Sequence, residues 1–306
     1  MYGSLQEFNY FECTFCGTLQ IYEIPDDMGV YYPSNYYSFS DDQSNGLSQS
    51  VGALRMKMRG IRTNYILHER SLIGRALQAY SPDQINASID WLRKANVQTD
   101  STILDVGCGF GRILRLLREK GFTRLFGVDP YIPEEVKETC LSIEKKTIFE
   151  SHGAYDLVMF NHSFEHMPNP KEIMAAANAL CKPGGTVLIR TPVAACAAWR
   201  KYGEYWVQLD APRHLFIPTE SGIRALAAEF DLELRDTIYD STELQFYGSE
   251  MYRKSLPLFQ ENGEKTISAL APFSTAEMDD FKRHSEFLNT IQQGDQAAFF
   301  LHRRTT

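Results

Sequence analysis

A glycine-rich turn between a short apolar run and a helix-forming run constrains this chain more than any other feature. Residues 102–106 have the composition of a buried strand, and residues 111–120 have helical periodicity. Gly107, Gly109 and Gly111 lie between them, where glycine lets the backbone approach a ligand closely and the helix N–H groups point toward it. The segment predicts a nucleotide-type cradle. A tight strand-to-helix turn with glycines for geometry alone is the alternative.

Short apolar runs alternate with helical segments after this turn, as is typical of a parallel sheet wrapped by helices. We expect strands at residues 102–106, 124–128, 147–149, 156–161 and 186–190, and helices at residues 111–120, 134–141 and 171–181. A helix at 219–230 and two strands at 233–239 and 297–302 follow. The predicted fold class is α/β, with a Rossmann-like, doubly wound, mostly parallel sheet of seven strands.

Four regions are expected along the 306 residues. Residues 1–54 are polar and rich in Tyr, Pro, Asp and Ser, which is typical of an N-terminal extension of loops and turns. Helices follow in residues 55–98, and residues 99–240 with 296–306 form the sheet domain. Residues 241–295 have helical patterning and are too many for a bare loop, so we expect a helical insertion or lid before the last strand.

Two further features narrow the ligand of the turn. Asp129 ends the strand at 124–128, where a carboxylate can accept both hydroxyls of a ribose; capping a helix before Pro130 is its alternative role. A dinucleotide fingerprint needs a third glycine at position 112, which is Arg112 in this chain. The residue at 112 therefore disfavours a nicotinamide oxidoreductase.

At these residues the chain resembles the class I S-adenosylmethionine-dependent methyltransferases. Residues 105–111 match their first motif, Asp129 their ribose carboxylate, residues 155–158 their fourth strand and residues 182–185 (Lys-Pro-Gly-Gly) the turn before strand five. The resemblance implies that S-adenosylmethionine or S-adenosylhomocysteine binds, with Asp105 positioning the methionine amino group and a residue near Glu150 or Ser151 beside the adenine. The implied cofactor-binding residues are Asp105, Gly107, Cys108, Gly109, Phe110, Gly111, Asp129, Pro130, Asn161 and His162.

Residues 31–39, 161–167 and 210–216 are similar to one bacterial subgroup of these enzymes, which broadly resembles ubiquinone-type O-methyltransferases and sugar methyltransferases. This resemblance implies methyl transfer to a small-molecule acceptor, a sugar or a phenolic or quinone-like compound. The alternative is a non-catalytic protein that binds S-adenosylmethionine or S-adenosylhomocysteine as a scaffold or sensor. Only turnover separates the two hypotheses.

Three candidate catalytic side chains follow the predicted strands at their carboxyl ends, where open α/β sheets bind ligands. His166 and His214 are candidate proton acceptors, and Arg213 could bind an anionic group of the acceptor. Structural imidazoles and an ion pair between Asp210 and Arg213 are the alternatives. Residues 162–166 also have a metalloprotease spacing, but a strand precedes them and Pro168 follows, so we reject hydrolysis.

We expect the acceptor pocket between the end of strand four, the loop at 210–214 and the insertion, with Tyr247 and Tyr252 contributing to acceptor specificity. If the insertion packs elsewhere, Tyr36 and Tyr37 of the extension are the candidates.

Charge and cysteine usage exclude several other classes. The net charge of −8 disfavours a nucleic-acid partner, and no apolar stretch approaches the length of a membrane span, so we expect a cytoplasmic protein. Cys13 and Cys16 have the spacing of half a zinc site, and the remaining cysteines are isolated. We therefore expect reduced thiols and no metal in the core, and we do not expect zinc. The sequence does not indicate an oligomeric state.

Overall fold

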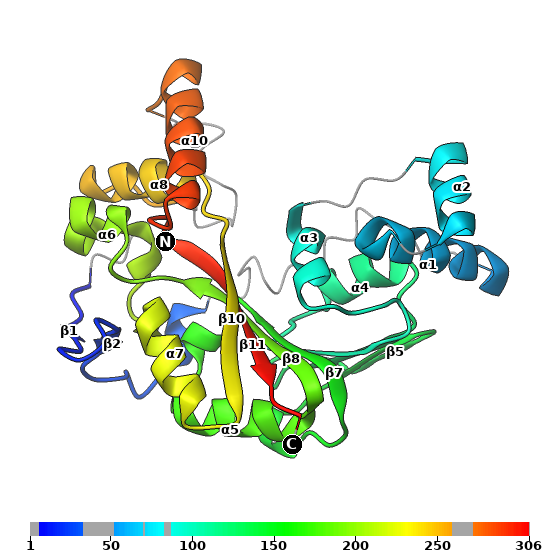
Figure 1. Cartoon of the computed structure of the whole chain (residues 1–306). Helices are drawn as coiled ribbons and strands as arrows, with labels where there is room; N and C mark the ends of the chain where they lie inside the picture. Colours follow the sequence, from blue (N-terminus) through cyan, green and yellow to red (C-terminus); the bar gives the residue numbers. More distant parts are fainter. Residues whose placement is uncertain (1–5, 33–51, 70, 83–86, 259–271, 306) are drawn as a thin grey trace.

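A central sheet and the helices on its two faces organise the computed structural model, which describes residues 6–32, 52–69, 71–82, 87–258 and 272–305 (Figure 1). The strand order is β10 (Leu232–Tyr239), β11 (Gln296–Arg303), β8 (Cys181–Pro192), β7 (Tyr155–Asn161), β3 (Thr102–Val106), β4 (Arg124–Val128), β6 (Leu141–Glu144) and β5 (Val136–Glu138). The neighbours from β8 to β6 pair in parallel, whereas β5, β10 and β11 pair antiparallel. The expected α/β fold with a mostly parallel, doubly wound sheet is confirmed.

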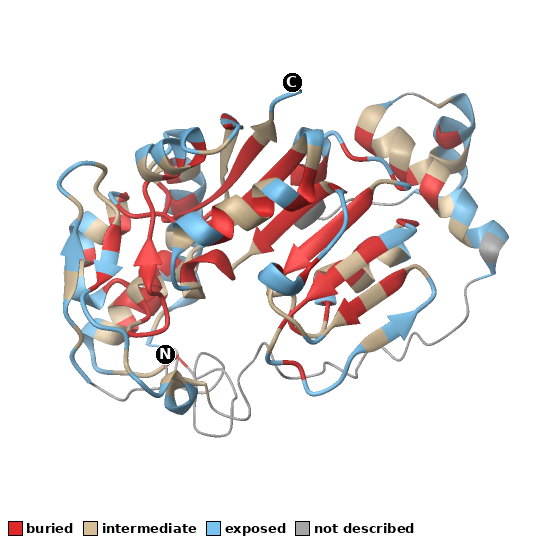
Figure 2. Cartoon of the chain, turned by 90° about the horizontal axis from the view of Figure 1, so that it is seen from below, coloured by how far each residue is buried: buried red, intermediate tan, exposed pale blue. Residues whose placement is uncertain are grey.

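Alternation along the strands divides the core into two layers, because successive side chains of a strand point to opposite faces. Val158 and Phe160 of β7 pack in one cluster with α5 (Pro170–Leu180) and α7 (Glu220–Ala228). Leu157 and Met159 pack in the other cluster with α3 (Ala87–Lys94) and α4 (Arg112–Glu119). The central strands are accordingly buried on both faces (Figure 2). The loops that follow the central strands therefore leave the sheet at its edge.

The region after β4 differs from its prediction. Residues 134–141 form no helix, and residues 147–149 form no strand. β5 lies in the first stretch, β6 begins at its last residue, and the 3₁₀ helix η2 (Ile148–Glu150) overlaps the second stretch. In β6, Leu141 and Ile143 are buried while Ser142 and Glu144 are half-buried, and this period of two is typical of a strand. β6 pairs in parallel with β4 and is the third parallel strand along the chain. The sheet of the described residues thus has eight strands, and the predicted number of seven is wrong.

The N-terminal extension is more ordered than predicted. β1 (Tyr10–Glu12) and β2 (Leu19–Ile21) form a hairpin, and β2 also pairs with β9 (Phe216–Ile217), so that three strands make a small second sheet. The 3₁₀ helix η1 (Met28–Tyr31) follows this hairpin. Two helices, α1 (Ala53–His68) and α2 (Leu72–Tyr80), precede α3. Pairing of β2 with β9 places the hairpin next to the loop at 210–215.

The described residues of the insertion before the last strand form two helices. α8 (Leu244–Arg253) and α10 (Thr275–Thr290) pack with α6 (Ala197–Tyr202) in a third apolar cluster, and Tyr247 and Tyr252 lie against this cluster. The backbone N–H of Val207, in the 3₁₀ helix η5 (Val207–Leu209), donates to Ser249 Oγ of α8 (3.0 Å). The 3₁₀ helix η4 (Gly203–Tyr205) completes this region. The insertion is therefore attached to the loops that follow β8.

None of the helices in the described ranges is long and apolar enough to cross a membrane.

Candidate functional site

The glycine turn lies at the carboxyl edge of the sheet, between the end of β3 and the start of α4. The backbone N–H of Gly107 donates to Val128 O (2.8 Å), which fixes the turn to the end of β4. Gly107 has a φ of +72°, and a Cβ at this position would lie 2.6 Å from Ser163 Cβ. Both the backbone conformation and the space therefore require glycine here.

Two buried carboxyl groups, those of Asp105 and Asp129, lie beside the turn. Asp129 Oδ2 accepts a hydrogen bond from Gly109 N (2.9 Å), and Oδ1 accepts one from Tyr131 N (2.8 Å). Burial and the charge of Asp129 raise the pKa of Asp105 well above its usual range. Within the part of the chain that the structure describes, neither carboxyl group forms a salt bridge. An acidic, buried pair of this kind fits a ligand that brings its own positive charge and ribose hydroxyls.

The other predicted cofactor residues are also near this turn. Cys108 and Phe110 are half-buried within it, Gly111 caps α4 in the left-handed conformation, and Pro130 follows Asp129. The residue expected beside the adenine changes, because strand three is β6 rather than residues 147–149. Glu150 is held by a capping box with Thr147, whereas Glu144 stands at the carboxyl end of β6 and pairs with Lys146.

A second loop follows β7 and is attached to the glycine turn. Ser163 Oγ donates to Val106 O (2.6 Å) at the end of β3, and His162 N donates to Arg190 O (2.8 Å) of β8. His162 has a φ of +53°, so the chain reverses sharply at this position. Asn161 and His162 therefore lie at the junction of three strand ends, and the 3₁₀ helix η3 (Phe164–His166) follows directly.

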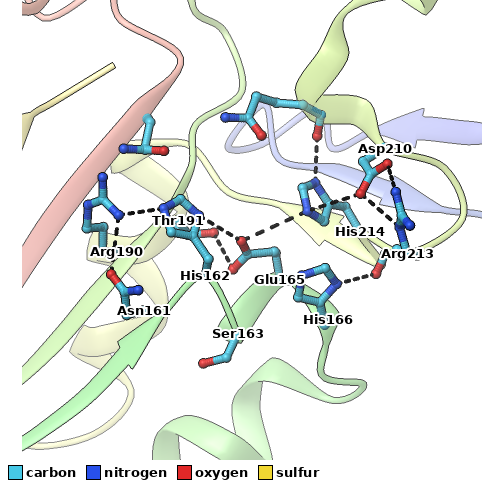
Figure 3. Close-up of polar contacts among 12 residues, drawn as sticks. Asn161, His162, Ser163, Glu165, His166, Arg190, Thr191, Asp210, Arg213 and His214 are labelled. Carbon is cyan, nitrogen blue, oxygen red and sulfur yellow. Dashed lines mark hydrogen bonds and ion pairs between the residues drawn. The ribbon is translucent and has the colours of Figure 1, made fainter. Parts of the chain in front are cut away.

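A cluster of the buried Glu165 carboxylate and three imidazoles lies at this loop, with His214 buried and His162 and His166 half-buried (Figure 3). Glu165 is fully buried; its Oε2 accepts a hydrogen bond from Thr191 Oγ1 (3.0 Å), and its Oε1 lies 3.4 Å from His162 Nδ1 and 4.0 Å from His214 Nε2. The rings of His166 and His214 meet edge to face with centroids 4.7 Å apart. Burial opposes ionisation of Glu165, but the neighbouring imidazoles of His162, His166 and His214 lower its pKa to about 2. The two predicted histidines are thus brought together around an anion.

Arg213 forms a buried ion pair with Asp210. Its Nε donates to Asp210 Oδ2 (2.9 Å), and its Nη2 donates to the other carboxylate oxygen. Both side chains are buried, and Arg213 lowers the pKa of Asp210 to about 2 although burial opposes this shift. The ion pair is the alternative role that the sequence analysis gave for Arg213, and it shapes the loop that carries His214.

Arg190 of β8 is a site residue that the sequence analysis missed. Its Nη1 lies 2.6 Å from His162 Nε2 and 3.2 Å from Asn161 Oδ1, and its Nε donates to Asp240 Oδ2 (2.6 Å). A single arginine at the end of an otherwise apolar strand was the available signal.

The N-terminal extension contributes further residues, and two of them, Tyr31 and Tyr32, begin the segment at 31–39 that the resemblance indicated. Tyr32 Oη lies 3.3 Å from His166 Nδ1, Tyr10 Oη donates to His214 O (2.7 Å), and Arg213 Nη1 donates to Tyr31 O (3.3 Å). The extension therefore packs against the loop that carries His214 and against His166. Tyr36 and Tyr37 lie outside the described residues.

Cys13 and Cys16 lie in the turn between β1 and β2, and both thiols are free. Cys16 Sγ donates to Thr18 Oγ1 (3.2 Å). Hydrogen bonds from the backbone of Cys16 and Phe15 lower the pKa of the Cys13 thiol. In the ranges that the structure describes, the pair belongs to no group of three potential metal ligands.

The known proteins to which this chain is similar are methyltransferases. A family model described as a methyltransferase domain matches residues 68–237, more than half of the chain. The ubiquinone biosynthesis O-methyltransferase of Dechloromonas aromatica is 28% identical over 121 residues, which are 34% of this chain and 49% of the relative. The corresponding enzyme of Vibrio parahaemolyticus is 34% identical over 112 residues, or 33% of this chain and 47% of the relative. The chain spans about half the length of the curated relatives it matches.

Among solved structures, the cyclopropane synthase MmaA2 from Mycobacterium tuberculosis is 14% identical, with a TM-score of 0.47 over 90% of this chain and 98% of that chain. This likeness is too loose to carry an argument about function.

Proposed function

The chain belongs to the methyltransferase domain family, the class I S-adenosylmethionine-dependent methyltransferases, and from this premise we propose that it methylates a small-molecule acceptor, a sugar or a phenolic or quinone-like compound. The observation that carries this proposal is the buried pair Asp105 and Asp129 beside a turn that only glycine can form. S-adenosylmethionine, when bound, supplies an activated methyl group on a positively charged sulfur.

The residues of the turn have separate roles in this proposal. Asp129 holds the two ribose hydroxyls, and Asp105 faces the positively charged methionine end, where its buried carboxyl group gains a counter-charge. Glu144, at the carboxyl end of β6, takes the position beside the adenine. Gly107 and Gly109 leave room for the ligand against the backbone.

The acceptor binds where the loop after β7, the loop before β9 and the extension come together. His166 is the residue in reach of an acceptor, because it is half-buried, whereas His214 is buried beneath it. In-line displacement at sulfur needs alignment and exclusion of water, and the insertion on the loops after β8 supports both. The similarity to ubiquinone biosynthesis O-methyltransferases supports a phenolic or quinone-like acceptor.

Two assays test the proposal in sequence. Calorimetry with S-adenosylhomocysteine should give one site per chain. S-adenosylmethionine radiolabelled at the methyl group is then incubated with 3,4-dihydroxybenzoate, a polyprenylated catechol or a nucleotide sugar, and label should move to one of them. Binding without transfer to any acceptor of these classes would favour a scaffold or sensor, and absence of binding would remove the cofactor assignment.

A further inference from the structure

One oxygen of the buried Glu165 carboxylate has no hydrogen-bond partner among the described residues. Thr191 Oγ1 donates to Oε2 (3.0 Å), whereas no donor in the described ranges reaches Oε1, which is buried. The groups nearest to Oε1 are imidazoles, with His162 Nδ1 at 3.4 Å and His214 Nε2 at 4.0 Å. A buried carboxylate is costly unless it is paired or coordinates a metal. Oε1 is therefore directed at the imidazoles without receiving a proton from one (Figure 3).

Two of the imidazoles are oriented by backbone carbonyl groups. His214 Nδ1 lies 2.6 Å from Gln208 O, and His166 Nδ1 lies 2.9 Å from Arg213 O. A carbonyl only accepts, so each Nδ1 carries the ring proton and each lone pair is on Nε2. Histidines that bind a metal almost always donate their other ring N–H to a carbonyl or carboxylate, which fixes the tautomer and the ring. His166 and His214 therefore have the outer hydrogen bond that is typical of metal ligands.

The other polar side chains of the cluster are occupied by arginines. His162 Nε2 lies 2.6 Å from Arg190 Nη1, and a guanidinium group only donates, so the lone pair of this ring is already used. Both carboxylate oxygens of Asp210 accept from Arg213. One ligand atom from each of the remaining three residues lies within 4.8 Å of the other two, and no other group of three in the described ranges has this spacing. These residues are Glu165, His166 and His214.

We propose that Glu165, His166 and His214 form a binding site for a divalent transition-metal ion. Two imidazoles and one carboxylate suit ions such as Fe²⁺ and Co²⁺, whereas Mg²⁺ and Ca²⁺ prefer sites made of oxygen atoms. The carboxylate supplies the charge, and Oε1 gains the partner that it lacks among the described residues. Three side chains leave positions on the ion open for small oxygen ligands. This site goes beyond the proposed function, which needs no metal.

The backbone holds the two loops of this site together. Glu165 and His166 are consecutive in η3, and Leu215 N, next to His214, donates to Glu165 O (2.8 Å). Ligands bound to one ion at about 2.1 Å lie at most about 4.2 Å apart, so the three ligand atoms have to close by less than about 1 Å. No metal in the core was expected from the sequence, since these ligands come from two loops that are separate along the chain.

Titration with Co²⁺ tests the site, because the visible absorption of this ion reports its ligands. The full chain is freed of metal with EDTA, desalted and titrated. We expect one Co²⁺ per chain, no thiolate charge-transfer band in the near ultraviolet, and no displacement by excess Mg²⁺ or Ca²⁺. X-ray absorption of the loaded protein should show imidazole ligands and no sulfur. The double variant Cys13→Ser/Cys16→Ser should bind Co²⁺ equally well, which separates this site from the thiol pair.

Two variants remove single ligands. Glu165→Gln keeps the size of the side chain but removes its charge, and His166→Gln removes an imidazole that is only half-buried. Each should weaken Co²⁺ binding at least about tenfold, since even changes outside the ligand set cost that much. The matched control is His302→Gln, because His302 Nδ1 also lies 2.9 Å from a carbonyl, Gly185 O, but His302 belongs to no ligand group in the described ranges. It should leave Co²⁺ binding unchanged.

Thermal unfolding of the metal-free variants shows whether each is folded, and His166→Gln tests the site even if the core variant Glu165→Gln is not. Absence of stoichiometric Co²⁺ binding would overturn the proposal and leave Glu165 Oε1 to a water molecule. Sulfur ligands, displacement by Mg²⁺, or equal affinity in His166→Gln and the unmodified protein would overturn it as well. Binding of S-adenosylhomocysteine is measured on metal-free protein, so the proposed function and this inference fail independently.

Discussion

At the residue scale, Asp129 is the side chain that the cofactor depends on most. Its two carboxylate oxygens already accept hydrogen bonds from Gly109 N and Tyr131 N, so it orders the turn, and in the proposed function it also holds the ribose. Asp129→Ala removes a charge-assisted contact as well as this order. We expect S-adenosylhomocysteine to bind at least about tenfold more weakly, since one such contact is worth 1.5 kcal/mol or more, and calorimetry measures the change.

The matched control for this prediction is Asp236→Ala, which removes a half-exposed carboxylate on β10. It should leave the affinity for S-adenosylhomocysteine unchanged. An unchanged affinity in Asp129→Ala as well would remove Asp129 from the site.

The residues that the sequence indicated differ from those that it missed in one respect, the separation along the chain between a residue and its contact partner. The three glycines and Asp129 belong to strand-to-loop junctions that recur in a fixed local order, so a pattern identifies them. Arg190 contacts a partner 28 positions earlier and Tyr32 one 134 positions later. Neither contact leaves a periodic trace. The sequence therefore indicated the histidines but not the side chains that contact them.

At the scale of elements, the loop before β9 depends on the ion pair of Asp210 and Arg213. Removing one partner leaves a buried charge, so Arg213→Met should lower the free energy of unfolding by about 3–5 kcal/mol at pH 7. The control is Arg283→Met, which breaks an exposed pair with the same spacing, to Asp280, and should cost less than about 1 kcal/mol. Urea unfolding compares the two variants, and equal losses would contradict the buried role.

The same ion pair gives the loop a dependence on pH. The pKa of Asp210 in the folded protein is about 2, below the value of about 3.9 in an unfolded chain. The stability that Asp210 contributes is therefore fully present above pH 4 and is lost as the pH falls toward 2. The difference between Arg213→Met and the unmodified protein should shrink over that interval. A difference that is constant from pH 5 to pH 2.5 would contradict this account.

The hairpin of β1 and β2 carries the one pair of closely spaced cysteines, and we predict that it folds without metal. Leu19 and Ile21 of β2 are buried in the apolar clusters, and β2 pairs with β9, so the hairpin is held by packing and by backbone hydrogen bonds. Addition of EDTA or 1,10-phenanthroline should leave the thermal transition in place. Loss of the cooperative transition on chelation would show that a metal holds this element.

Short elements were also where the predictions from sequence failed. β5 and β6 have three and four residues, and a stretch of this length fits either periodicity until its neighbours are known. The longer strands β3, β4 and β7 were predicted almost to the residue, because each forms an apolar run in the centre of the sheet. A strand that is buried on both faces is apolar along most of its length, and this composition made these strands predictable from the sequence.

At the scale of the whole molecule, the end of the insertion is fastened to the sheet by a buried acid. Asp295 immediately precedes β11, and its Oδ2 accepts a hydrogen bond from the indole N–H of Trp206 (3.1 Å), which lies between η4 and η5. Val193 N donates to Asp295 O (2.8 Å) just after β8. One residue thus joins the last strand, the loop after β8 and the base of the insertion. Whether the Asp295 carboxyl group is protonated therefore affects how strongly the whole insertion is attached to the sheet.

Burial raises the pKa of Asp295 to about 6, above the value of about 3.9 in an unfolded chain. The folded protein therefore binds an additional proton between pH 4 and 6, and the stability associated with this proton is lost as the pH rises through 6. Above that pH the buried charge costs up to about 3 kcal/mol, the equivalent of two pKa units.

Asp295→Asn keeps an oxygen for the Trp206 N–H and removes the charge. We expect it to raise the free energy of unfolding by about 1–3 kcal/mol at pH 8 and to change it little at pH 4.5, as measured by urea unfolding at both values. Asp236→Asn, at a half-exposed position, should have no such dependence. If Asp295→Asn destabilises the protein equally at both pH values, the carboxylate is needed as a charged hydrogen-bond acceptor, and the insertion is attached by that charge in spite of its burial.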